Sequence, residues 1–99
     1  MRRGTTPSHT FTTDIDLSDA EVVYVTYKQG SKVILEKDKD GMDITSDSIV
    51  IELTQEDTLS FKMGQPVRVQ IRARFPSGSA VASNIIQTTA DEILKEGEL

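Results

Sequence analysis

Four acidic residues crowd a short stretch of the chain: Glu36, Asp38, Asp40 and Asp43. Calcium and other hard cations bind several oxygens at once, so this stretch is a candidate cation site. An EF-hand loop has its glycine at the sixth position, whereas Gly41 occupies the fourth position counted from Asp38. We therefore interpret the stretch as a solvated turn between strands, with weak cation binding as the alternative.

Residues that could perform catalysis are scarce. The chain has one histidine, His9, and no cysteine, so its serines and threonines have no evident base to activate them. Gly41 and Gly78 fall in predicted turns rather than in a phosphate-binding loop. We predict a non-enzymatic protein with no catalytic residues, no metal ligands and no cofactor.

Three arginines alternate with apolar residues in the segment 66–75, PVRVQIRARF. Successive side chains of a strand point to opposite faces, so Arg68, Arg72 and Arg74 share the face opposite the core. We interpret them as partners of acidic residues on neighbouring strands, where such pairs fix the register. Nucleic acid is disfavoured as a ligand, because no aromatic residues interleave with the arginines and the net charge is −5.

Length and composition predict one domain that folds around its own core. The chain has 99 residues and no cysteine for a disulfide. Its acidic balance argues against binding to anionic membranes as well as to nucleic acid. The basic start is not followed by the apolar stretch of a secretion signal, and the apolar runs are far shorter than the ~20 residues of a membrane-spanning helix.

The first residues carry the candidate partner-binding side chains. Residues 1–8 have no periodic apolar pattern and are predicted to form a flexible arm. Such an arm can become ordered on a neighbouring subunit, and an ordinary frayed terminus is the alternative. The candidate contacts are Arg2, Arg3, Thr5, Thr6, Pro7 and His9.

Strand-like alternation recurs through the rest of the chain at the spacing typical of a sandwich or barrel. The predicted strands are 9–17, 21–29, 32–37, 42–45, 48–53, 66–75 and 80–89. Ser83 and Asn84 could form a bulge in the last of these strands. Thr54 and Asp57 have the spacing of a helix cap, which predicts a helical turn at 55–59.

These elements predict an all-β, immunoglobulin-like antiparallel sandwich of about seven strands with one short helical turn. The sandwich domain covers residues 9–99 and ends in a short C-terminal helix or a tail. The predicted core consists of Phe11, Ile15, Val23, Val25, Tyr27, Val33, Leu35, Ile49, Ile51, Leu53, Leu59, Val67, Val69, Ile71 and Phe75.

Several short words of sequence carry a resemblance to a group of viral proteins: RGTTP at 3–7, HTF at 9–11, LTQEDT at 53–58 and ASNI at 82–85. The chain resembles small, mostly uncharacterised proteins encoded in the tail regions of phages and prophages of Gram-positive bacteria. It is also loosely similar to the N-terminal immunoglobulin-like domain of phage baseplate upper proteins.

The resemblance implies a structural or assembly protein of the tail or baseplate type. Its expected partners are other phage structural proteins or a second copy of itself, and neither nucleic acid nor membrane is expected. The expected location is the cytoplasm during assembly, with the virion as a further location. The alternative is a carbohydrate- or ligand-binding β-sandwich, although two tyrosines, three phenylalanines and no tryptophan offer little surface for stacking sugars.

Overall fold

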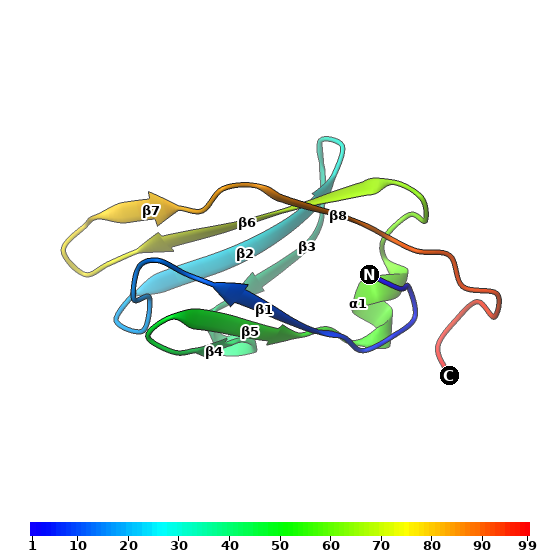
Figure 1. Ribbon diagram of the computed structural model, residues 1–99, viewed down its shortest axis with the longest axis horizontal. Coiled ribbons are helices and arrows are strands. Elements are labelled where there is room, and N and C mark those ends of the chain that lie inside the picture. Colours follow the sequence, from blue (N-terminus) through cyan, green and yellow to red (C-terminus); the bar gives the residue numbers. More distant parts are fainter.

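Eight strands and two short helical turns make up the fold, which is a computed structural model describing residues 1–99. Figure 1 shows the strands as two layers, with both chain termini near the same end of the molecule. The strands are β1 (Ser8–Thr12), β2 (Val22–Gln29), β3 (Lys32–Asp38), β4 (Asp43–Ile44), β5 (Ser48–Glu52), β6 (Pro66–Arg74), β7 (Ala80–Ala82) and β8 (Ile86–Thr89). The helical turns are the 3-10 turn η1 (Lys39–Gly41) and the helix α1 (Gln55–Leu59).

The strands form two antiparallel sheets that face each other (Figure 1). One sheet has the order β1-β5-β4, and the other has the order β3-β2-β6-β7, with β8 also paired to β6. Hairpins stay within a sheet, while the chain changes sheets between β1 and β2, between β3 and β4, and between β5 and β6. This connectivity is that of an immunoglobulin-type sandwich, with β1, β5 and β4 in the places of strands B, E and D. The predicted fold class is confirmed.

The core lies between the sheets and is built by strand alternation. In β6, Val67, Val69, Ile71 and Ala73 are buried, and the residues between them face outward. The full set of buried apolar residues is Leu17, Ala20, Val23, Val25, Tyr27, Ile49, Ile51, Leu53, Phe61, Val67, Val69, Ile71, Ala73 and Ala90.

Two predicted core residues are exposed. Val33 is 49% exposed, because the pairing of β2 with β3 shifts register after Tyr27 at the edge of the sheet. Ile15 is 48% exposed, because β1 ends at Thr12 and the chain leaves the sheet there. Four other predicted core residues are half-buried at the margin: Phe11, Leu35, Leu59 and Phe75.

The helix lies where the sequence predicts it, and the last strand is broken where the sequence predicts a bulge. Thr54 and Asp57 form a reciprocal capping box, in which each side chain accepts a hydrogen bond from the other residue's backbone amide, at 3.1 and 3.0 Å. Ser83 separates β7 from β8 by accepting a hydrogen bond from the Ile71 amide at 2.9 Å. The structure thus has eight strands rather than about seven, since this break divides the last strand. Residues 90–99 contain no helix, so the C-terminus is a tail.

Candidate functional site

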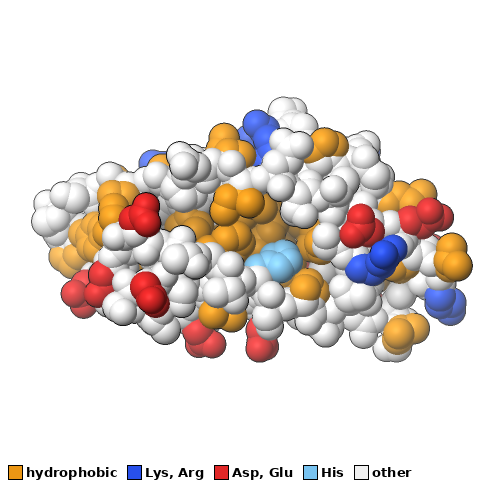
Figure 2. All heavy atoms as spheres, viewed as in Figure 1, with side chains coloured by type: hydrophobic (Ala, Val, Ile, Leu, Met, Phe, Trp, Pro, Cys, Tyr) orange, Lys and Arg blue, Asp and Glu red, His pale blue; other side chains and the backbone are white.

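An apolar groove of about 610 Å³ lies between the edge of β1 and the edge formed by β7 and β8. We name it the β1–β7 groove. It appears in Figure 2 as a hollow lined with apolar side chains between the two layers. Its apolar lining is Phe11, Ile15, Leu17, Ile71, Val81, Ala82 and Ile86, and its polar lining is Thr10, Thr12, Thr13, Asp14, Ser83 and Asn84.

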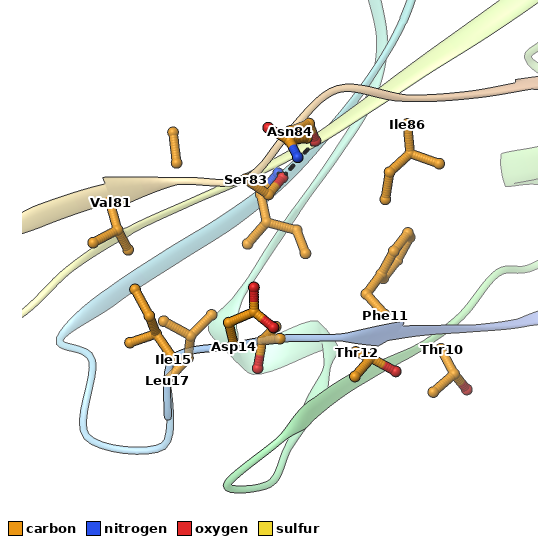
Figure 3. Close-up of a pocket in the computed structure, with 13 residues that line it drawn as sticks. Thr10, Phe11, Thr12, Asp14, Ile15, Leu17, Val81, Ser83, Asn84 and Ile86 are labelled. Atoms are coloured by element: carbon orange, nitrogen blue, oxygen red, sulfur yellow. Dashed lines mark hydrogen bonds between the residues drawn. The ribbon is translucent and has the colours of Figure 1, made fainter.

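Apolar side chains from opposite layers point toward one another across the groove (Figure 3). Phe11 points from β1 toward Ile86, and Val81 points from β7 toward Ile15. Ile15 and Ile86 are 48% and 44% exposed, and the adjacent Ile85 is 57% exposed. Large apolar side chains gathered at one exposed place are typical of a binding surface.

The edge of β1 that borders the groove has no pairing partner. Two hydrogen bonds, one at the Pro7 carbonyl and one at the Thr13 amide, are 2.9 Å long and point to the β5 side. Since backbone groups alternate sides along an antiparallel strand, those of Ser8, Thr10 and Thr12 point away from β5. No strand lies on that side of β1. The strand therefore offers a row of free backbone donors and acceptors.

The facing edge of β7 is also unpaired. Hydrogen bonds to β6 and its turn engage the Ser79 carbonyl at 2.9 Å and the Ser83 amide at 2.8 Å. By the same alternation, the backbone groups of Ala80 and Ala82 point away from β6. The β1–β7 groove thus has an unpaired strand edge on each side, and exposed edges of this kind readily pair with another chain.

Two polar groups in the lining have no partner within the chain. The Thr13 hydroxyl oxygen is buried without a hydrogen bond. Asp14 extends from the end of β1 toward the β7–β8 side (Figure 3) and takes part in no ion pair. No lysine, arginine or histidine lines the groove. The groove therefore has an unmatched negative charge beside its apolar surface.

The predicted arm, by contrast, is held against the body of the protein. The Met1 amine donates to the Thr89 carbonyl at 2.9 Å, and the Asp91 amide donates to the Met1 carbonyl at 2.7 Å. Arg2 forms a parallel bridge with Asp91. Residues 1–3 are therefore held beside the segment that follows β8 by an isolated bridge, and the prediction of a free arm is corrected by these backbone hydrogen bonds.

Arg3 fixes the arm to the end of the sandwich that carries α1. Its side chain donates to the Phe61 carbonyl at 2.8 Å and to the Leu59 carbonyl at 3.3 Å, and forms an ion pair with Glu96 at 3.0 Å. Gly4 follows with a φ of 72°, where a Cβ atom would lie 2.9 Å from the Ile93 side chain. The positive φ is what favours glycine here, because the Ile93 methyl is the end of a flexible side chain and can shift.

Thr5 and Pro7 also form hydrogen bonds within the chain. Thr5 and Thr58 exchange backbone–hydroxyl hydrogen bonds of 3.1 and 2.9 Å. The Pro7 carbonyl, just before β1, accepts a hydrogen bond from the Leu53 amide. Thr6, between Thr5 and Pro7, is exposed. The structure therefore brings these residues together in one segment that crosses between the sheets.

His9 lies where this crossing segment meets the groove. Its Nδ1 atom is 2.9 Å from the Tyr27 hydroxyl, and its ring meets Phe11 edge to face at a centroid distance of 6.3 Å. Burial lowers the pKa of His9, and the positive charge of the chain's N-terminus lowers it further. Burial, together with the charge of Asp57, raises the pKa of Tyr27. Both shifts favour the uncharged form of the ring.

The arginine face has fewer acidic partners than the sequence predicts. Arg74 pairs with Glu21 at 3.7 Å, but the Arg68 side chain donates to the Gly30 carbonyl at 2.7 Å. The residues directly opposite Arg68 and Arg72 on neighbouring strands are not acidic. The predicted role of these arginines in setting register through charge pairs is therefore wrong for Arg68 and Arg72.

The acidic stretch folds as a turn. The Asp38 carboxylate accepts a hydrogen bond from the Asp40 amide at 3.1 Å and so caps η1. No three histidine, aspartate or glutamate side chains anywhere in the chain converge closely enough to hold a metal. The stretch adds nothing to the candidate site.

Comparisons with protein families, with curated proteins and with solved structures found no match for this chain. Neither helical turn has the length and apolar character needed to cross a membrane. Function is therefore inferred from the β1–β7 groove, which sequence reasoning missed. The available signal was the adjacent pair Ile85 and Ile86, whose side chains a single strand face could not bury together.

Proposed function

We propose that this protein is a non-enzymatic assembly module that acts through protein–protein contacts, with the β1–β7 groove as its contact surface. The observation that carries the proposal is an apolar groove with an unpaired strand edge on each side. A partner segment can satisfy the free backbone groups and cover the apolar side chains at the same time.

The resemblance to phage tail-region proteins supplies the biological setting for this proposal. In a tail or baseplate, the partner is another structural protein or a second copy of this chain. The alternative of a carbohydrate-binding module has less support, because Phe11 is the only aromatic residue in the groove. Phe11 also points toward Ile86 rather than presenting a flat platform (Figure 3).

The test is co-expression of the chain with each structural protein encoded by the neighbouring genes, and with a differently tagged copy of itself. We expect one of these proteins to co-purify with the chain in a fixed ratio. Ile86→Asp places a charge in the groove and should abolish the complex. Val33→Asp is the matched control, because Val33 is an equally exposed apolar residue of β3 outside the groove.

Circular dichroism and thermal unfolding establish that both variants are folded before the comparison is made. Loss of the complex with Ile86→Asp but not with Val33→Asp supports the proposal. Failure of every candidate to bind contradicts it, as does a complex that tolerates Ile86→Asp.

A further inference from the structure

We infer that the β1–β7 groove takes an extended strand of a basic partner protein, which pairs with β1 and places a lysine or arginine beside Asp14. The inference rests on the proposed function and adds the binding geometry and the chemistry of the partner.

The strand pairs with β1 because that edge is the longer of the two free edges. Three residues of β1, Ser8, Thr10 and Thr12, direct their backbone groups outward, whereas β7 contributes only Ala80 and Ala82. An added strand extends the sheet from β1-β5-β4 to four strands.

At the other end of the same gap between the sheets, the chain's own first residues already form an isolated bridge of this kind. Residues 1–3 pair with the segment that follows β8, through Arg2 and Asp91. That pairing stops before the groove, because the chain crosses at Gly4–Pro7 to reach β1 in the opposite sheet. The partner strand therefore occupies space that the chain's own N-terminal segment leaves open.

Strand geometry sets an apolar pattern for the partner. Side chains directly opposite each other on paired strands share a face, so a partner residue opposite Phe11 points into the groove. Alternate partner residues then cover Phe11, Ile86 and Val81, which point into the same space (Figure 3). Apolar residues at every second position of the partner are required.

Charge identifies the partner as basic. The Asp14 carboxylate faces the groove without an ion-pair partner, and no basic side chain lines the groove. Acidic side chains also flank the left part of the hollow in Figure 2. A second copy of this chain carries a net charge of −5 and would add repulsion, so a different and basic protein fits better.

The test is a selection of random ten-residue peptides displayed against the folded chain. We expect the retained peptides to alternate apolar residues and to share a lysine or arginine at one position. Binding of a synthetic retained peptide is then measured by fluorescence anisotropy. Asp14→Lys should weaken it about tenfold, because an attraction becomes a repulsion.

Exchanging the shared basic residue of the peptide for glutamate should restore binding to Asp14→Lys. Asp19→Lys makes the same charge change at an exposed residue outside the groove and should leave the affinity nearly unchanged. Methylating alternate backbone nitrogens of the peptide should abolish binding, since these nitrogens donate to β1.

Peptides that depend on Ile86 but are indifferent to Asp14 would overturn this inference and leave the proposed function standing. Peptides that tolerate backbone methylation would overturn the strand geometry. Self-association blocked by Ile86→Asp but not by Asp14→Lys would identify a second copy as the occupant and overturn the basic partner. If every retained peptide binds the Ile86→Asp variant as tightly as the unmodified chain, the proposed function itself is overturned.

Discussion

The two ends of the gap between the sheets differ in how they are covered. Near α1, residues 1–7 cross from the sheet of β8 to the sheet of β1 and pair with both (Figure 1). At the far end, β1 and β7 present bare edges over the β1–β7 groove. We call the first of these the covered end.

The covered end shows what the groove lacks. There, hydrogen bonds from residues 1–3 satisfy backbone groups, and the Arg3 side chain satisfies one carbonyl at the end of α1 and one just after it. In the groove, Thr10 and Thr12 have free backbone groups, and Ile86 is exposed. One added strand would supply both kinds of contact, so the difference points to an intermolecular role for the groove.

The largest expected effect on folding comes from removing one aromatic ring at each end. Phe61 is buried against Tyr27 at the covered end, so Phe61→Ala should lower the free energy of unfolding by about 3 to 5 kcal/mol. Phe11 is only half-buried in the groove, and Phe11→Ala should cost about 1 kcal/mol. Urea unfolding measures both, and equal losses would contradict the contrast between a covered and an open end.

A smaller difference in unfolding free energy is expected between alanine substitutions of Arg3 and Arg2. Arg3→Ala leaves the Phe61 and Leu59 carbonyls without their donor, which should cost about 1 to 3 kcal/mol. Arg2 donates to the Glu92 carbonyl at the surface, so Arg2→Ala should change the unfolding free energy by less than about 0.5 kcal/mol. If both substitutions are neutral in urea unfolding, the segment does not close this end as described.

The smallest expected effect is a pH dependence of stability caused by His9, which lies between the covered end and the groove. Because the pKa of His9 lies below its ordinary value of 6.5, the unfolded chain binds a proton more readily than the folded one. The free energy of unfolding should therefore be highest above pH 6.5. It should fall as the pH drops from 6.5 through the lower pKa that His9 has in the folded protein. Thermal unfolding between pH 5 and 7 measures this slope, and His9→Gln should remove it. A slope that survives in His9→Gln would assign it to another group.

Much of the fold follows from sequence pattern, because alternation, turn residues and capping are local. The alternation at Pro66–Arg74 predicts β6, and the spacing of Thr54 and Asp57 predicts α1. The limits of the last strand are less predictable, since Ser83 replaces a backbone contact with its side chain.

The candidate site could not be predicted in the same way, because it depends on contacts between distant residues. The sequence shows that Arg3 is basic and near a terminus, but its partners are 56 and 58 residues away. Likewise, Phe11 and Ile86 come to line one groove only after two sheets are stacked. Local pattern therefore suggested a free arm as the contact surface. In the folded chain the arm residues bind other parts of the protein, and the groove stays exposed.

Strand addition at the β1–β7 groove is measured most directly by amide hydrogen exchange followed by NMR, with and without the strongest peptide from the selection. In the free chain, the amides of Thr10 and Thr12 should exchange quickly, while those of His9 and Phe11, which face β5, exchange slowly. In the complex, the amides of Thr10 and Thr12 should become protected. A tight complex in which these two amides still exchange quickly would contradict strand addition at the β1–β7 groove.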